Sequence, residues 1–232
     1  MKENLVLLMV GGFGKRLLPL TKNTPKPLLK VGRKPLLEFI VEQLSEHGFY
    51  KICMATHYKG DLIRSYFGDG QAWKVNISYI EESEPLGTAG ALTLIESKYL
   101  TKPILVMNGD ILTRLNFRQL LEFHESHTAQ ATMCVRECDF QIPYGVVESN
   151  GEQVSRIVEK PSQTYSVNAG IYVLNPSIIR NRNKSPEYND MTDLLSEVVN
   201  SGNTVNKFPI KEYWMDIGQI EEYEKAQVEY LK

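Results

Sequence analysis

The chain has 232 residues, of which 42% are hydrophobic, with 26 basic and 28 acidic side chains and three cysteines. This length and composition predict one globular domain, or a domain with a small appendage, and a sizeable core. No apolar run approaches the roughly 18 residues of a membrane span, and the N-terminal run is typical of a strand rather than a signal peptide. We therefore expect a cytoplasmic protein without membrane contact, whose thiols stay reduced.

The first part of the chain alternates apolar strands with amphipathic helices. Strands are predicted at residues 5–9, 52–55, 75–80, 104–107 and 132–135. Helices are predicted from Pro35 to a cap at Gly48, at 61–67, at 89–95 and at 116–127. Asn116, with Gln119 three residues later, is typical of a capping box. The alternation predicts a mostly parallel sheet with helices on both faces.

The pattern changes after residue 135. Shorter strands are predicted at 145–148, 155–159 and 168–174, then a helix at 191–200, strands at 205–208 and 214–216, and a closing helix from about 220. There is no repeat, linker or clean domain boundary. We interpret this part as a lobe built onto the same sheet.

A glycine-rich loop follows the first predicted strand. The missing side chains of Gly11, Gly12 and Gly14 would let backbone N–H groups approach an anion closely. Lys15 and Arg16 add positive charge directly after them. The spacing fits neither a P-loop nor a dinucleotide-binding fingerprint, so the kind of phosphate is left open by the loop itself.

Further positive charge lies near this loop. Residues 1–34 hold eight Lys or Arg against the single acid Glu3. Lys26 lies between two prolines, which restrict its backbone and would hold its ammonium group near one place. We favour a local anion site over a nucleic-acid patch, although charge alone is compatible with both.

Polar residues follow several later strands, and ligands of open α/β sheets bind at the carboxyl ends of strands. Asp110 and Asp216 would suit Mg²⁺ if they converged, because this ion takes one or two carboxylates together with substrate phosphates. Gly87 and Thr88 form a loop-to-helix turn against which a flat ring could lie. Each of these features alone is also compatible with an ordinary turn or helix start.

The second half contributes an acceptor, a cation and an amide. Glu159, Lys160 and Asn168 together suit a phosphorylated polyol, although a surface ion pair and a strand asparagine would give the same pattern. The four histidines show no metal-ligand spacing, and no Ser–His–Asp or Cys–His set is present.

Taken in chain order, these blocks resemble the sugar-1-phosphate nucleotidylyltransferase family, the nucleotide-sugar pyrophosphorylases. The matching segments are GGFGKRLLPLT, PKP, GTAG, NGD, YGV, EKP, NAG and DIG, and they cover nearly the whole chain. The resemblance implies an α/β fold of the nucleotide-diphospho-sugar transferase type. This is a Rossmann-like single domain with a mixed, mostly parallel sheet and a small sugar-binding lobe. Residues 1–135 would bind the nucleotide and residues 136–232 the sugar phosphate.

The resemblance also implies the reaction, a Mg²⁺-dependent transfer of a nucleotidyl group from an NTP to a sugar-1-phosphate, with release of pyrophosphate. Family likeness favours GTP and a hexose or amino-hexose 1-phosphate. It further suggests a homo-oligomer and no nucleic-acid partner.

The resemblance assigns each site residue a role. The catalytic residues would be Arg16, Lys26 and Asp110, and the metal ligands Asp110 and Asp216. The nucleotide would contact Gly11, Gly12, Gly14, Lys15, Arg16, Gly87, Thr88 and Asn108. The sugar phosphate would contact Tyr144, Gly145, Glu159, Lys160 and Asn168. Lys15 stands where the family commonly has Thr or Ser, so its role is left open.

Several alternatives remain. A uridylyl-, thymidylyl- or cytidylyltransferase of the same family has the same motifs. A metal-dependent glycosyltransferase usually has Asp-x-Asp at the metal strand, where this chain has the single acid of NGDIL. A non-catalytic nucleotide sensor could keep the glycine loop and lose Lys26, Asp110 or Asp216, and all three are present.

Overall fold

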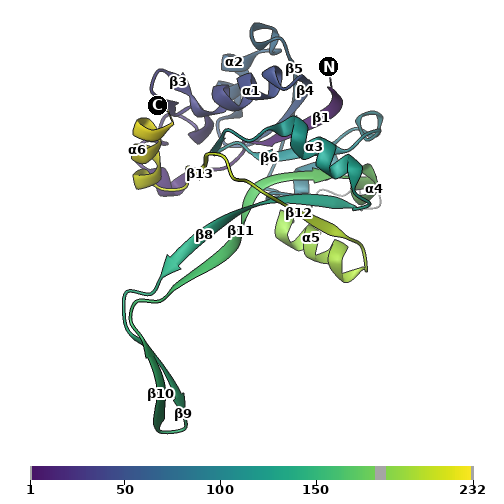
Figure 1. The fold of residues 1–232 in the computed structure, drawn as a ribbon. Helices are drawn as coiled ribbons and strands as arrows, with labels where there is room; N and C mark the ends of the chain where they lie inside the picture. Colours follow the sequence, from purple (N-terminus) through teal and green to yellow (C-terminus); the bar gives the residue numbers. More distant parts are fainter. Residues whose placement is uncertain (1, 181–186, 231–232) are drawn as a thin grey trace.

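The computed structural model describes residues 2–180 and 187–230, which form one seven-stranded sheet flanked by helices (Figure 1). In sheet order the strands are β12 (Val205–Pro209), β8 (Ala131–Gln141), β11 (Ser162–Leu174), β6 (Ile104–Asn108), β1 (Lys2–Met9), β4 (Phe49–Thr56) and β5 (Asn76–Glu81). Only β11 runs antiparallel to its neighbours. The predicted mixed, mostly parallel sheet is confirmed, and it contains strands from both halves of the chain.

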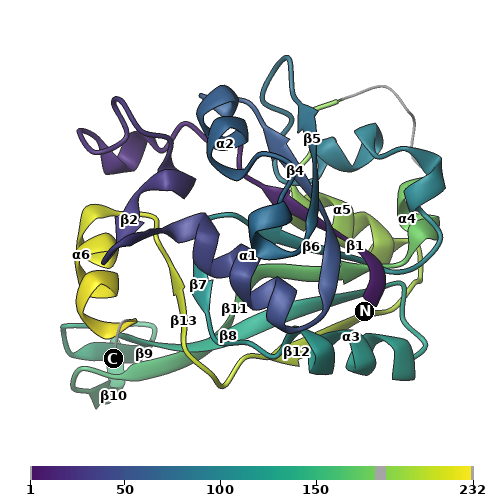
Figure 2. The same cartoon turned by 90° about the horizontal axis from the view of Figure 1, so that it is seen from above.

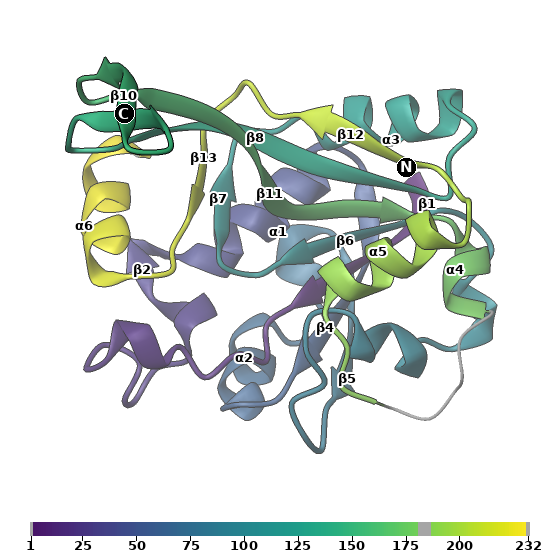
Figure 3. The ribbon, with the colours of Figure 1, turned by 90° about the horizontal axis from the view of Figure 1, so that it is seen from below.

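Helices cover both faces of this sheet. Val6 and Leu8 pack into the core on one face, whereas Leu5 and Leu7 pack into the core on the other, because side chains alternate along β1. The first face is covered by α1 (Leu36–Glu46), α2 (Gly60–Phe67) and α3 (Phe117–Ser126), and the second by α4 (Pro176–Arg180) and α5 (Met191–Asn200). Figure 2 shows α1 in front of the sheet, and Figure 3, from the opposite side, shows α5 in front of it. A central strand buried on both sides explains the continuous apolar run of β1.

A small second ladder lies beside the carboxyl end of β6. β7 (Ile111–Thr113) pairs antiparallel with β13 (Trp214–Asp216), and α6 (Ile220–Glu229) follows β13. This pairing places β13 beside the segment that follows β6 in the sequence. It places residues that are about a hundred positions apart next to each other.

The second half forms a projecting hairpin, whose two short outer strands were predicted at 145–148 and 155–159, and whose two inner strands are longer than predicted. β8 and β11 continue beyond the sheet as a two-stranded ladder, which ends in the hairpin of β9 (Val146–Asn150) and β10 (Gln153–Val158) (Figure 1). We call residues 137–166 the arm. The boundaries predicted for β8 and β11 were too short because the arm pairs only with itself, so its outer part carries no run of buried residues.

Two further details differ from the sequence predictions. The segment 89–95 is a 3₁₀ helix at Gly90–Leu94 instead of an α-helix. A Cβ at Gly90 would lie 2.6 Å from Leu86 Cβ, so the segment packs tightly against the loop before it. Helix α1 begins at Leu36, and Gly48 follows its cap with a φ of 84°.

No helix among the described residues is long and apolar enough to span a bilayer.

Asn116 caps the N-terminus of α3 as predicted, although Gln119 does not complete the predicted capping box, and this cap gives a stability test. Asn116 Oδ1 accepts hydrogen bonds from the backbone N–H groups of Arg118 (3.1 Å) and Gln119 (3.2 Å). Asn116→Ala is expected to lower the free energy of unfolding by about 1 kcal/mol, as measured in urea. Gln119→Ala is the matched control, because its side chain does not complete the reciprocal half of a capping box, and it should change the free energy little.

Candidate active site

A cavity of about 340 Å³ opens at the carboxyl ends of β1 and β6. This is the position where open α/β sheets bind ligands. Its lining includes Gly11, Gly12, Phe13, Lys26, Glu82, Gly87, Thr88, Asn108, Asp110, Tyr188 and Asp190. Eight of the predicted site residues thus lie in or beside one cavity: seven line it, and Asp216 is adjacent through β13.

The strongest polar contact in the cavity is an ion pair between Lys26 and Asp110. Lys26 Nζ lies 2.5 Å from Asp110 Oδ2, and Lys26 is only 8% exposed. The lysine begins the 3₁₀ turn Lys26–Leu28, which is preceded by Pro25 in an extended conformation. The prolines on both sides fix the backbone, so the buried ammonium is held against β6.

Asp216 joins this pair through the β7–β13 ladder. Asp216 is paired with Ile111, and the N–H of Ile217 donates to the carbonyl oxygen of Asp110 at 3.0 Å. The two aspartates predicted as metal ligands are therefore neighbours in space. Sequence spacing could not show this, because the contact depends on a strand pairing between distant segments.

The carboxylate of Asp216 is in an unfavourable environment. Burial and the nearby charge of Asp110 raise its pKa to about 6, and Lys26 only partly offsets this effect. Asp110 Oδ1 and Asp216 Oδ1 are both buried without a hydrogen-bond partner. One ammonium group thus balances two carboxylates, and each keeps an oxygen that is free to bind a cation.

These two oxygens fit a divalent ion that has substrate ligands as well. In residues 2–180 and 187–230 no group of three or more His, Cys, Asp or Glu side chains is arranged to bind a metal. Mg²⁺ commonly takes one or two carboxylates and completes its shell with phosphate oxygens and water. The donor set matches that pattern.

Arg16 approaches the same cluster from the glycine loop. A Cβ at Gly218 would lie 3.5 Å from both terminal guanidinium nitrogens of Arg16. Glu222 Oε2 accepts hydrogen bonds from the N–H groups of Gly218 and Gln219, both at 2.7 Å, and so fixes this turn. Arg16 therefore lies beside the loop that follows Asp216, as an exposed cation at the cavity edge.

Two glycines of the loop differ in the space that surrounds them. Gly14 has a φ of 62°, and a Cβ there would lie 2.8 Å from Thr21 Cγ2. Gly12 has open space where a Cβ would be, on the cavity side. Lys15 does not line the cavity; its ammonium group lies 5.3 Å from the ring centroid of Phe13.

Gly87 and Thr88 form the opposite wall and are anchored to the start of α5. A Cβ at Gly87 would lie 2.5 Å from Asn189 O, so no larger residue fits. Asp190 Oδ1 accepts from Thr88 N–H (3.1 Å) and from the Thr88 hydroxyl (3.2 Å). The N–H of Met191 donates to Thr88 Oγ1 at 2.8 Å. This wall is therefore rigid.

Glu82 is a pocket residue that the sequence reasoning missed. It is only 7% exposed, and a Cβ at Gly11 would lie 3.4 Å from its Oε2. Burial raises the pKa of the Glu82 carboxyl, and the backbone N–H of Leu86 opposes this shift. The sequence contained a signal for Glu82, because it directly follows β5, and Asp110 likewise comes two residues after β6. Tyr188 and Asp190 gave no such signal, since they come from a distant segment.

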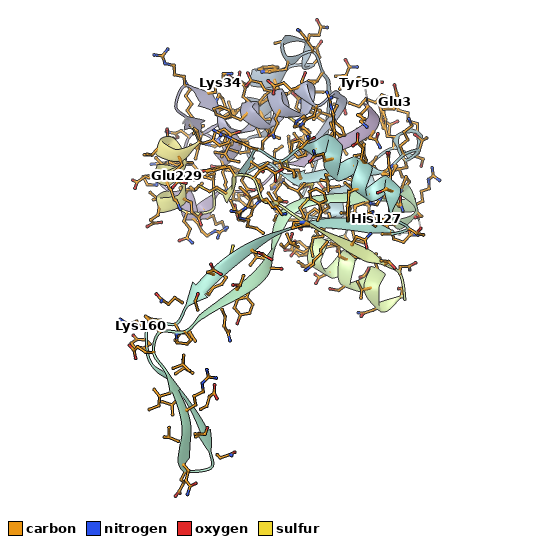
Figure 4. The ribbon with its side chains drawn as sticks, viewed as in Figure 1. Glu3, Lys34, Tyr50, His127, Lys160 and Glu229 are labelled. Atoms are coloured by element: carbon orange, nitrogen blue, oxygen red, sulfur yellow. The ribbon has the colours of Figure 1, made fainter. Side chains whose placement is uncertain are left out.

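The predicted sugar-phosphate residues are not at the cavity. Tyr144, Gly145, Glu159 and Lys160 all lie on the arm, and Figure 4 shows Lys160 far from the body of the protein. The structure therefore does not bring these four residues to the cavity of the same chain. Asn168 lies at the root of the arm, where its Oδ1 accepts from Gly170 N–H at 3.0 Å.

The raised pKa of Asp216 predicts a pH-dependent effect on stability. Its pKa in the folded protein lies above the ordinary aspartate value of 3.8. The ionised carboxylate therefore lowers the free energy of unfolding fully above pH 6, and this effect disappears below pH 4. In metal-free protein, Asp216→Asn should raise the free energy of unfolding by about 1 kcal/mol at pH 8, allowing for solvent screening. Denaturant unfolding should show no gain at pH 4.

An exposed carboxylate serves as the control for this measurement. Glu152→Gln, in the turn of the arm, should leave the unfolding free energy unchanged at both pH values. A loss of stability at pH 8 on Asp216→Asn would contradict the unfavourable environment of Asp216.

The chain is similar to known proteins over most of its length. Residues 5–232 match the family model described as Nucleotidyl transferase. The chain is 36% identical over 228 residues to a probable mannose-1-phosphate guanylyltransferase 1 of Oryza sativa subsp. japonica, covering 94% of this chain and 62% of that protein. It is 37% identical over 237 residues to a mannose-1-phosphate guanyltransferase of Aspergillus fumigatus, covering 97% and 64%.

Among solved structures, HddC from Yersinia pseudotuberculosis complexed with GMP-PN is similar to this chain. The TM-score is 0.75 at 28% identity, and the match covers 99% of this chain and 100% of that one. The chain spans less than two thirds of the length of the two curated relatives. Because the family model covers nearly all of it, the chain belongs to the Nucleotidyl transferase family.

Proposed function

We propose that this chain transfers a guanylyl group from GTP to a hexose-1-phosphate and releases pyrophosphate. The observation that carries the proposal is the convergence of Lys26, Asp110 and Asp216 at the carboxyl edge of the sheet, beside a glycine loop. The nucleotide would lie between that loop and the wall of Gly87 and Thr88. Residues 1–135 would thus bind the nucleotide, and residues 136–232 the sugar phosphate.

The chemistry needs charge neutralisation more than proton transfer. An oxygen of the sugar phosphate forms a bond to the α-phosphorus while the bond from that phosphorus to the bridging oxygen breaks. Pyrophosphate leaves with the bonding electrons. The nucleophile has a second pKa of about 6 and is mostly dianionic at neutral pH, so no general base is required. Lys26 and Arg16 would reduce the repulsion between the two anions.

A divalent ion completes this arrangement when bound. Members of this family are generally dependent on a divalent metal, and we propose Mg²⁺ held by Asp110 and Asp216. It would supply positive charge at the α-phosphate and a fixed orientation of its oxygens. Lys26 already contacts Asp110, so the aspartate would be oriented before the substrate arrives.

Glu82 supports guanine as the base. Guanine carries two adjacent donors, N1–H and the 2-amino group, and a carboxylate can accept from both at once. Uracil and thymine would instead present carbonyl oxygens on either side of their single N–H, which a carboxylate repels. The curated relatives named above are guanylyltransferases for mannose-1-phosphate, which agrees with this choice.

The two rival functions are less compatible with the site. A glycosyltransferase has no use for a basic loop at the position of leaving pyrophosphate. A nucleotide sensor would not need Lys26 and two carboxylates with unsatisfied oxygens. The direct experiment is a pyrophosphate-release assay with four NTPs, Mg²⁺ and a panel of hexose-1-phosphates. GTP with mannose-1-phosphate should give the fastest release, and release with no sugar phosphate would contradict the proposal.

Loss of either partner of the ion pair should abolish most activity. Lys26→Ala and Asp110→Ala are each expected to lower turnover by about 10²-fold or more, because each removes a preorganised charge at the reacting phosphates. Lys22→Ala is the matched control, since Lys22 is an exposed lysine of the same loop. Near wild-type turnover in folded Lys26→Ala or Asp110→Ala protein would refute the assignment.

Glu82 can be tested by base selectivity. Glu82→Gln replaces two acceptors by one acceptor and one donor, so the ratio of kcat/KM for GTP to that for UTP should fall by about 10²-fold. Glu84→Gln changes an exposed carboxylate two residues away and should leave the ratio unaltered. An unchanged ratio in Glu82→Gln would show that the base is recognised elsewhere.

A further inference from the structure

The arm exposes an apolar face that no residue of 2–180 or 187–230 covers. Seven of its large apolar side chains are exposed: Phe140, Ile142, Tyr144, Val147, Val154, Ile157 and Tyr165. Each hydrogen bond, ion pair and ring contact described for arm side chains joins two residues of the arm itself. Exposed apolar surface of this extent marks an interaction site.

The register of the tip shows that the apolar groups share one side. Val147 is paired with Ile157, and Ser149 with Val154, so all four point to the same face of the hairpin. Ile157 is 67% exposed. The opposite face carries the ion pair of Glu148 and Arg156, and next to the stem the half-buried pair of Val146 and Val158. The tip is thus amphipathic, as a strand pair is when one face packs against protein.

The stem continues this division. Phe140 and Tyr165 lie on one face with ring centroids 5.7 Å apart. On the other face Thr164 donates to Asp139 Oδ1 at 2.6 Å. The arm therefore carries an apolar face and a polar face at both its stem and its tip.

The surface of the single chain is larger than that of a compact monomer. It exposes 12674 Å², whereas a compact monomer of 26.5 kDa is expected to expose about 10,700 Å². The excess of about 2,000 Å² is more than the roughly 800 Å² that each partner contributes to a standard interface. The arm thus provides enough surface for a stable dimer.

The arm is rigidly held away from its own cavity. Its stem is paired from Val135–Asn168 to Gln141–Ser162 without a register shift, and the only shift lies inside the sheet, between Asn168 and Tyr172. At about 3.3 Å per residue the arm reaches on the order of 40 Å. Folding back onto its own cleft would require breaking this ladder, whereas a second copy can receive the arm as it stands.

The direction of the arm favours a partner at the same edge. β8 runs parallel to β1 and β6, so the arm leaves the sheet at the carboxyl edge where the cavity opens. That edge also exposes Phe13, Leu18 and Leu20 of the glycine loop, which offer an apolar rim for an incoming strand pair.

We propose that two copies of this chain exchange their arms. The apolar face of each arm packs on the rim of Phe13, Leu18 and Leu20 of the other copy and brings Tyr144, Glu159 and Lys160 to that copy's cavity. This inference rests on the proposed function for the sugar-phosphate role of those residues. The exchange is reciprocal, so both cavities of a two-fold dimer are completed by a partner.

Sedimentation tests the interface without reference to activity. The wild-type chain should be a dimer, Ile157→Asp and Val154→Asp should be monomers, and Gln153→Asp, on the polar face of the same strand, should remain a dimer. Two variants on the apolar face guard against a folding defect in one of them. A monomeric wild type, or dimers that survive both apolar-face variants, would overturn the proposal.

Complementation tests the contribution of the arm to the partner's cavity. Lys26→Ala damages the body and Lys160→Ala damages the arm, so each variant alone should be nearly inactive. Co-expressed with different tags and purified through both, they give mixed dimers in which one of the two cavities receives an intact arm, which should restore about one half of wild-type turnover. No recovery, as closure within one chain would give, or full activity of Lys160→Ala alone would overturn the exchange.

The two tests separate the inference from the proposed function. If wild-type protein shows no nucleotidyl transfer at all, the function fails, and sedimentation still decides whether the arms join two copies. If wild-type protein is active but the variants do not complement each other, the function stands and the arm exchange fails.

Discussion

The structure depends on one electrostatic imbalance, a single buried ammonium group shared by two carboxylates. Lys26 contacts Asp110 directly, while Asp216 adds a second negative charge that raises its own pKa to about 6. Such a cluster is costly to fold, because buried charges lose hydration and are only partly compensated here. Rigid surroundings hold it in place: prolines flank the lysine, and the β7–β13 ladder fixes the second aspartate.

The same imbalance is what phosphoryl chemistry requires. Two anions must meet in the reaction, and groups that already point at the reacting phosphates need no reorganisation when charge moves. The charge cluster lowers the stability of the folded protein without substrate and is stabilised when a cation and phosphates bind. The protein is thus less stable than it could be, in exchange for activity. The glycine loop and the wall of Gly87 and Thr88 then act as positioning surfaces on either side of this charge cluster.

Some features of the fold and the site could be predicted from the sequence, and others could not. Strand periodicity located Asp110 at the end of β6, and the general rule for α/β sheets indicated the correct edge. Strand-end reasoning also selected Asp216 as a candidate, but its approach to Asp110 could not be deduced from spacing, since it results from the pairing of two short distant strands. The length of the arm was missed because its strands pair with each other and bury little, so the usual apolar signal is absent. Glu82 was accessible to the same strand-end reasoning that selected Asp110.

Calorimetric titration with a non-cleavable GTP analogue, in Mg²⁺ and in EDTA, tests the charge cluster most directly. If Asp110 and Asp216 hold the divalent ion, Mg²⁺ should tighten binding to the wild-type chain by at least about tenfold, or 1.4 kcal/mol. In Asp110→Asn/Asp216→Asn protein the affinity should be the same with and without Mg²⁺. An equal gain from Mg²⁺ in both proteins would contradict the role of the two carboxylates.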